Sequence, residues 1–227
     1  MEGGFILINK PKGITSHDVV DKLREITKMK KIGHAGTLDP LAEGLLILGI
    51  GKKFTKKLSI FQNKDKEYIA CLKLGVASDT FDKEGKITEK KIRKIPQRKE
   101  VKKILKTFLG EIFQIPPIFS AKKIKGKKLY ELARKGIRIK PKPEKVKIYE
   151  ISILKYKFPY LKIKLTCSSG TYIRSLANDI GKKLKCGALV EKLVRTKIDK
   201  FSIKNAITLS KLNSQNWKDF LIKPNKF

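Results

Sequence analysis

The sequence predicts an α+β fold built on a mainly antiparallel β-sheet. Segments with strand patterns outnumber those with helical patterns, and hairpin-length connections are more frequent than the long crossovers that parallel strands need. The chain has 227 residues, of which 41% are hydrophobic, so it is long enough to bury a substantial core. No internal repeat or flexible linker divides it, and we therefore expect one domain over residues 1–227.

Hydrophobic periodicity and turn residues predict the elements of the first half. In chain order they are a strand over 5–9, a helix capped by Ser16 with Val19, Val20, Leu23 and Ile26 on one face, a strand over 45–50, a short helix near 54–61, a strand over 67–77, a polar turn over 78–85, and a helix from about Gln97 that stops at Gly110. In the strand over 67–77, Tyr68 shares its face with apolar residues at every second position.

The second half begins with a segment of different composition. Residues 120–147 carry twelve Lys and Arg against two Glu, with prolines before them at 116 and 117 and near their end at 141 and 143. We predict a protruding basic loop over about 116–145, with a short helix over 129–135 inside it. The elements expected beyond it are strands over 146–156 and 161–167, a loop opening into a helix over 168–184, a strand over 188–197, and a short helical tail after Thr208.

The charge balance favours a polyanionic partner. Lysine and arginine number 54 against 21 acidic residues, a formal net charge of +33. Neutralising phosphates releases condensed counterions, which favours nucleic acid. A membrane is disfavoured, because the chain has no strongly amphipathic basic helix and no apolar run near the roughly 20 residues of a span. A general lysine bias of the genome is the alternative explanation for the charge.

Cysteine and histidine usage argues against a metal site. The three cysteines (Cys71, Cys167 and Cys186) show no Cys-x-x-Cys spacing, and the chain has only two histidines. Free thiols suit a reducing cytosol, and no signal peptide precedes the first strand, so we expect a cytoplasmic protein. The segment around Gly49–Lys53 fails the phosphate-binding loop pattern, and we expect neither a metal nor a cofactor.

One carboxylate stands out within the segment Gly33–Leu46. Asp39 lies between a glycine-rich turn and Pro40, and an apolar run follows. Glycine allows a sharp turn and proline fixes the backbone after the carboxylate, so the side chain is held in place. A nucleophile or a general acid/base needs such positioning. An aspartate that only caps a backbone amide in the turn is the alternative.

The segment Gly33–Leu46 resembles the catalytic motif of the TruB family, tRNA pseudouridine synthases that act on uridine 55 of the T arm. Five further elements are similar to family motifs and occur in family order: residues 8–16, residues 66–68, residues 120–123 with 126–134 (the thumb loop), residues 170–174, and residues 193–195. The resemblance implies the pseudouridine synthase fold, with a mainly antiparallel mixed sheet flanked by helices. It also implies that the basic loop is the RNA-clamping thumb loop, inserted in a single catalytic domain with a tail over about 205–227.

The resemblance implies a reaction that breaks the N1–C1′ bond of uridine, turns the base and joins C5 to C1′. Asp39 would be the catalytic carboxylate, by attacking the sugar or base or by deprotonating C2′; the sequence leaves these routes open. An ionised carboxylate in a dry pocket needs a nearby cation. Arg174 is the candidate, since a guanidinium stays charged and pairs bidentately with carboxylates. An ordinary surface arginine is the alternative.

The remaining site residues also follow from the resemblance. Tyr68 would stack on the flipped uridine, Leu193 would form part of the same pocket, and His34 would fill the space that the base vacates. Lys10 would support the turn beside the site or position a phosphate. The thumb residues expected to contact phosphates are Lys122, Lys123, Lys127 and Arg134.

The expected partner is the T arm of tRNA, bound by a monomer without an obligatory protein partner. About thirty residues follow the last motif, too few for the complete C-terminal PUA domain of longer family members. Three other readings stay open: a guide-RNA-dependent synthase related to dyskerin, an RNA chaperone with the enzyme's architecture, and a basic ribosome-associated protein. The thumb loop favours a stand-alone enzyme that binds tRNA by itself over a guide-dependent enzyme.

Overall fold

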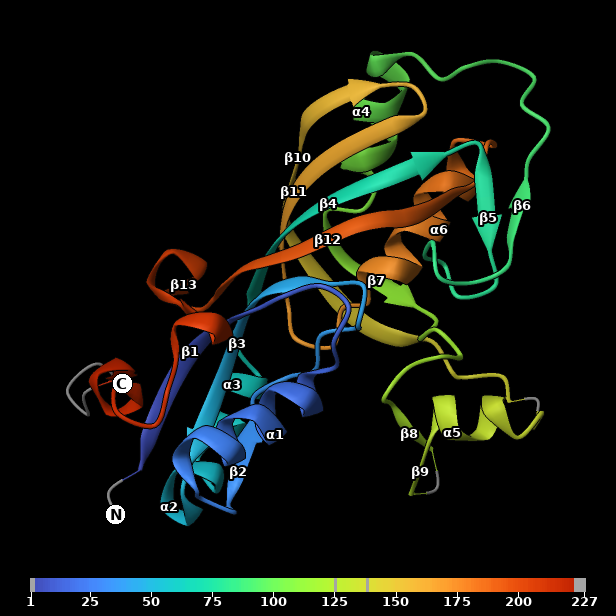
Figure 1. Ribbon diagram of the computed structural model, residues 1–227. Helices are drawn as coiled ribbons and strands as arrows, with labels where there is room; N and C mark the ends of the chain where they lie inside the picture. Colours follow the sequence, from blue (N-terminus) through green and yellow to red (C-terminus); the bar gives the residue numbers. More distant parts are fainter. Residues whose placement is uncertain (1–2, 125, 138, 223–227) are drawn as a thin grey trace. The chain divides into compact units, whose positions relative to one another are not determined.

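The computed structural model describes residues 3–124, 126–137 and 139–222 (Figure 1). The chain folds as two compact units. The first comprises Met1–Tyr68 and Leu193–Phe227, and the second comprises Ile69–Lys192. Strands β4 (Lys66–Leu74) and β12 (Ala188–Ile198) each contribute residues to both units. None of the helices in the described ranges has the length and apolar character that a membrane span requires.

The first unit is a mixed sheet with helices on its faces. Besides parts of β4 and β12, its elements are β1 (Gly4–Lys10), α1 (Ser16–Thr27), β2 (Ile32–His34), β3 (Glu43–Ile50), α2 (Lys52–Thr55), α3 (Ser59–Gln62), β13 (Phe201–Ser202), β14 (Ile207–Thr208) and β15 (Leu221–Ile222), with short 3-10 turns over Ile203–Asn205, Leu209–Lys211 and Trp217–Phe220. Its strands follow the order β14-β1-β3-β12, and β3 pairs antiparallel with β1 and parallel with β12.

The continuous apolar run of β1 reflects burial on both faces of this sheet. Ile6 and Ile8 pack in one cluster with Val19 and Leu23 of α1, whereas Phe5 and Leu7 pack in another with α3 and β13. Because side chains alternate between the faces of a strand, a strand covered on both sides is apolar at every position.

The second unit carries a second set of strands, in the order β4-β11-β10-β7, with helices. Its elements are β5 (Val76–Ser78), β6 (Ile87–Glu89), α4 (Arg98–Lys106), β7 (Gly110–Gln114), β8 (Lys123–Ile124), β9 (Lys127–Lys128), α5 (Leu129–Arg134), β10 (Glu144–Lys157), β11 (Tyr160–Cys167) and α6 (Ile173–Lys183). Strand β10 pairs antiparallel with both β11 and β7. The mainly antiparallel sheet flanked by helices confirms the predicted fold class.

Several predicted boundaries were wrong in instructive ways. Thr15, not Ser16, caps α1: its hydroxyl accepts from Asp18 N at 3.1 Å, and Asp18 Oδ2 accepts from Thr15 N at 2.7 Å. Helix α4 ends at Lys106, and Gly110 begins β7 at a φ of +87°. The helix expected near 54–61 is two short helices, α2 and α3, and the helical tail consists of 3-10 turns.

The basic segment 116–145 contains short regular elements among its described residues. A two-stranded hairpin, β8-β9, leads into α5, where Leu129 and Leu132 are buried. The predicted helix over 129–135 is confirmed. Lys125 and Arg138 lie outside the described residues. Ordering of this segment on RNA stays a prediction.

Candidate active site

Asp39 lies in the loop between β2 and β3 of the first unit. The loop leaves the sheet after His34, where Ala35 N donates to Ile47 O at 2.9 Å, and turns back where Ala42 N donates to Asp39 O at 3.0 Å. Leu38 and Leu41 on either side are buried, whereas Asp39 is half-buried. The buried side chains of Leu38 and Leu41 fix the loop against the core, and the Asp39 carboxylate between them keeps partial access to solvent.

Hydrogen bonds anchor the backbone on both sides of Asp39. The buried hydroxyl of Ser16 accepts from Leu38 N at 2.9 Å and donates to Leu38 O at 3.2 Å. Gly13 N donates to Pro40 O at 2.8 Å. The Ser16 hydroxyl is therefore engaged with the loop, which leaves the capping of α1 to Thr15. Because the backbone of Asp39 is already fixed, its carboxylate loses little conformational entropy when it reaches the reactive geometry.

Arg195 of β12 anchors the same loop and is almost completely buried. Its Nε donates to Leu45 O at 2.8 Å, and its two terminal nitrogens donate to Gly36 O at 3.1 Å and Thr37 O at 3.4 Å. Gly44 makes this packing possible, because a Cβ there would lie 2.4 Å from Arg195 O. One guanidinium thus joins both ends of the Asp39 loop to β12.

Lys10 places a second buried cation in electrostatic contact with Asp39. Its Nζ donates to Pro11 O at 2.8 Å and to Ile14 O at 2.6 Å, and its side chain has no exposed surface. Burial lowers the pKa of Lys10 to about 8, although the carboxylates of Asp39 and Glu43 act in the opposite direction. Two bonded carbonyls and complete burial favour the predicted supporting role of Lys10 over contact with a phosphate.

The pKa of Lys10 makes its charge sensitive to mild alkali. Above pH 8 the ammonium loses its proton, and Asp39 loses a neighbouring positive charge. We expect kcat/KM to fall as pH rises through about 8 and this alkaline limb to disappear in Lys10→Met. Initial rates between pH 6 and 9.5 measure it, and a wild-type profile that stays flat to pH 9 would contradict it.

The other predicted pocket residues of the first unit lie on its strands. His34 ends β2, and its pKa is lowered by burial first and by the Arg195 cation second, which keeps its ring neutral at pH 7. Tyr68 is 8% exposed and Leu193 6% exposed, on β4 and β12. Beside Tyr68, Thr196 Oγ1 donates to Glu67 Oε1 at 2.7 Å, which joins these two strands.

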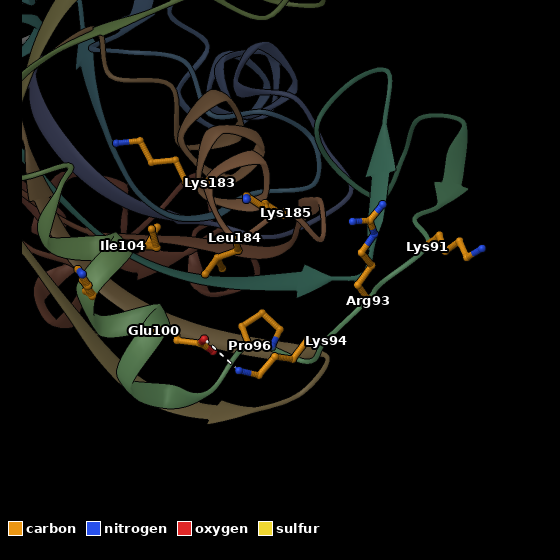
Figure 2. Close-up of a pocket in the computed structure, with 10 residues that line it drawn as sticks. Lys91, Arg93, Lys94, Pro96, Glu100, Ile104, Lys183, Leu184 and Lys185 are labelled. Atoms are coloured by element: carbon orange, nitrogen blue, oxygen red, sulfur yellow. Dashed lines mark ion pairs between the residues drawn. The ribbon is translucent and has the colours of Figure 1, made fainter.

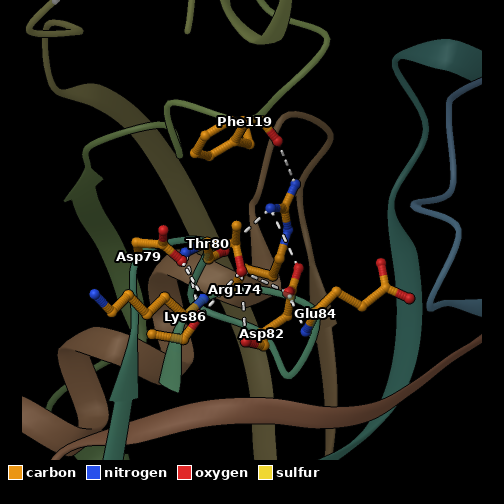
Figure 3. Close-up of polar contacts among 8 residues, drawn as sticks. Asp79, Thr80, Asp82, Glu84, Lys86, Phe119 and Arg174 are labelled. Atoms are coloured by element: carbon orange, nitrogen blue, oxygen red, sulfur yellow. Dashed lines mark hydrogen bonds and ion pairs between the residues drawn. The ribbon is translucent and has the colours of Figure 1, made fainter. Parts of the chain in front are cut away.

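Arg174 lies near the start of α6 in the second unit, within a network of polar groups (Figure 3). Its two terminal nitrogens donate to Thr80 O at 3.1 Å and to Phe119 O at 2.8 Å. Asp82 Oδ2 lies 3.4 Å from the guanidinium, and both side chains are 6% exposed. Asp82 Oδ1 in turn accepts from Thr80 Oγ1 at 2.6 Å and from Glu84 N at 3.0 Å. The network holds Arg174 in a fixed orientation.

Arg174 is therefore buried and paired, not an ordinary surface arginine. Its carboxylate partner within its own unit is Asp82, in the segment that the sequence presented only as a polar turn. The predicted Asp39–Arg174 pair joins two different units and stays a prediction. Sequence reasoning also missed the roles of Ser16 and Arg195; the motif at 193–195 was the one available signal for the latter.

The thumb residues are described only in part. Lys122 forms an ion pair with Glu144 at the start of β10, and Lys123 and Lys127 are exposed on the β8-β9 hairpin. Arg134 ends α5, and its side chain lies outside the described part. Exposed lysines on a hairpin can contact phosphates without reading sequence.

Family matches cover most of the chain. A family model described as TruB family pseudouridylate synthase (N terminal domain) matches residues 24–173, and one described as tRNA pseudouridylate synthase B C-terminal domain matches residues 174–223. The chain belongs to the TruB family of pseudouridylate synthases. The TruB resemblance read from the sequence motifs is thereby confirmed.

Curated relatives match this TruB-family chain over nearly its whole length. The tRNA pseudouridine synthase B of Clostridium tetani (strain Massachusetts / E88) is 47% identical over 98% of the chain and 77% of its own length. That of Endomicrobium trichonymphae is 48% identical over 93% of the chain and 91% of its own length.

Solved structures of larger assemblies share the fold. One chain of a Cbf5-Nop10-Gar1 complex superposes with a TM-score of 0.70 and 29% identity over 91% of this chain. One chain of an H/ACA RNP bound to a substrate RNA containing 2′-deoxyuridine gives a TM-score of 0.70 and 28% identity over 97%. The TruB-family chain spans 52% and 56% of those two chains.

Proposed function

We propose that the chain is a tRNA pseudouridine synthase that converts uridine 55 of the T arm into pseudouridine in the cytoplasm. Curated relatives at 47% and 48% identity are named tRNA pseudouridine synthase B, which supports tRNA as the substrate. The N1–C1′ bond breaks, the base turns, and a C5–C1′ bond forms while the proton on C5 leaves and N1 gains one. The atoms balance without a co-reactant, so the step is an isomerisation.

The anchored loop of Asp39 is the observation that carries the proposal. The backbone on both sides of this carboxylate is fixed, and the buried ammonium of Lys10 is in electrostatic contact with it. A pre-positioned carboxylate beside a cation is suited to attack a sugar or base carbon, and equally to remove the proton on C2′. We assign Asp39 the catalytic role by either route.

The other site residues have proposed roles in holding the flipped uridine. Tyr68 provides the wall on which the base stacks, and Leu193 an apolar surface beside it. His34 has a pKa lowered by burial, so a neutral ring would take the space that the base vacates in the RNA. Arg174 is the proposed ion-pair partner of Asp39 in the RNA-bound enzyme, and the thumb lysines contact phosphates.

Release of tritium from C5 of uridine tests substrate and position together. The purified chain is incubated with unmodified tRNA tritiated at uridine C5, and with the same tRNA carrying cytidine at position 55. We expect one equivalent of tritium released from the first and none from the second; equal release from both would refute position 55 as the site. No release although the tRNA binds would refute a stand-alone synthase.

The solved relatives motivate one alternative, an enzyme that depends on a guide RNA and protein partners. The titles of those structures name assemblies with other proteins or RNA. The same assay separates the alternatives, because a guide-dependent enzyme would not release tritium when the chain and tRNA are the only macromolecules present.

A further inference from the structure

Most of the side chains that line one groove in the second unit are cationic. The groove has a volume of about 610 Å³ and is bounded by α4, by the segment 91–96, and by the C-terminal end of α6 (Figure 2). Six cationic side chains line it, with one carboxylate, Glu100: Lys91, Arg93, Lys94, Lys103, Lys183 and Lys185.

The single carboxylate of the groove, Glu100, already has two partners. Glu100 Oε2 accepts from Gln97 N at 2.6 Å at the start of α4, and its Oε1 lies 3.5 Å from Lys94 Nζ. The backbone hydrogen bond from Gln97 is the main reason that the pKa of Glu100 is lowered, so the carboxylate is ionised and partly neutralised by Lys94. It has little capacity left to balance the other cations of the groove.

Lys183 has structural partners of its own. Its Nζ donates to Thr107 Oγ1 at 2.7 Å and lies 4.6 Å from the centre of the Phe108 ring. The four cations that remain, Lys91, Arg93, Lys103 and Lys185, form no ion pair with any carboxylate in the described ranges of the chain. Four unbalanced cations around one hollow repel each other, and a concave surface focuses their field.

We propose that this groove binds the phosphodiester backbone of the RNA substrate, as a site separate from the Asp39 loop. Its excess charge requires several negative charges, which successive phosphates along one strand supply. The apolar lining, Pro96, Ile104 and Leu184, is aliphatic, so the described lining offers no aromatic ring on which a base could stack. The groove therefore holds backbone and does not read sequence.

The groove is also distinct from the Arg174 network. Arg174 lies near the start of α6 and Lys183 at its end, about 14 Å apart along the axis at 1.5 Å per residue. RNA contacts here extend the footprint beyond the reacting nucleotide and raise affinity without taking part in the reaction. The inference rests on the proposed function, because it assumes an RNA substrate.

Neutralising three of the four unpaired cations tests the proposal. The triple variant Lys91→Gln, Arg93→Gln, Lys103→Gln is compared with wild type in tRNA binding between 50 and 300 mM salt and in steady-state kinetics. We expect the Kd for tRNA to rise at least about tenfold and the slope of log Kd against log salt to fall by about three, one per cation removed. We expect kcat at saturating tRNA to stay within about twofold of wild type.

A matched variant separates a specific groove from the general charge of the chain. Lys52→Gln, Lys53→Gln, Lys56→Gln removes the same charge from exposed positions on and beside α2 of the first unit. Equal losses in both triples, or none in the groove triple, would overturn the proposal. So would loss of tripolyphosphate binding with unchanged tRNA affinity, because that would assign the groove to a small polyphosphate. Failure of the proposed function is distinguishable, since wild type would then form no pseudouridine.

Discussion

Replacing Asp39 by asparagine is expected to abolish tritium release from tRNA while leaving tRNA binding unchanged within about twofold. Asparagine has nearly the same shape as aspartate, and the loop is anchored through the backbone of Leu38 and Pro40, so the variant should fold as wild type does. The amide can neither attack carbon nor accept the proton of C2′. By analogy with the loss of other essential catalytic groups, we expect kcat to fall by about 10⁴-fold or more.

Glu43→Gln is the matched control for this experiment. Glu43 begins β3, is exposed, and shares with Asp39 the electrostatic contact with Lys10. Its neutralisation removes the same charge from the same neighbourhood, and we expect kcat within about threefold of wild type. Asp39→Asn retaining more than a few per cent of wild-type kcat, or Glu43→Gln losing as much activity, would refute Asp39 as the catalytic group.

Hydrophobic patterns and turn residues predicted the structure correctly where the feature depended on residues within a single strand or loop. The uninterrupted apolar run Phe5–Ile8 in β1 predicted a buried strand, and alternation along β4 predicted the inward face that carries Tyr68. The glycine-rich turn before Pro40 predicted a held carboxylate, and the structure has that loop anchored on both sides. These features depend on backbone rules that act within a few residues.

Partners far apart in the sequence could not be predicted in the same way. Arg195 and Leu45 are 150 positions apart, and only the pairing of β12 with β3 brings the guanidinium to the Asp39 loop. Asp82 reaches Arg174 because the turn after β5 folds against α6, a contact with no periodic signal. Ser16 was misread as the cap of α1, since sequence alone does not tell which of two neighbouring hydroxyls the helix uses.

The second large effect is expected at Arg195, which supports the Asp39 loop without touching substrate in the proposed mechanism. Arg195→Met fills similar volume but leaves the carbonyls of Leu45 and Gly36 without their donors. An unsatisfied buried carbonyl costs roughly 1–3 kcal/mol, so we expect a loss of about 3 kcal/mol in the free energy of unfolding. Urea unfolding measures it.

A partly exposed arginine, Arg24, gives the control for that loss. Arg24→Met removes a guanidinium that lies 2.7 Å from Asp21 on the surface of α1, and such pairs contribute less than about 1 kcal/mol. A loss at Arg195 no larger than at Arg24 would show that the buried guanidinium does not anchor the loop.

Activity and pH dependence distinguish a positioning role for Arg195 from a purely structural one. At a temperature where Arg195→Met is fully folded, we expect kcat to be about 10²-fold below wild type, because a displacement of about 1 Å at a reacting group costs that much. The Arg195 cation also lowers the pKa of Lys10, so its removal should raise that pKa above 8 and move the alkaline limb of kcat/KM to higher pH. A folded variant with wild-type kcat and an unmoved limb would mean that Arg195 stabilises the first unit but does not position Asp39.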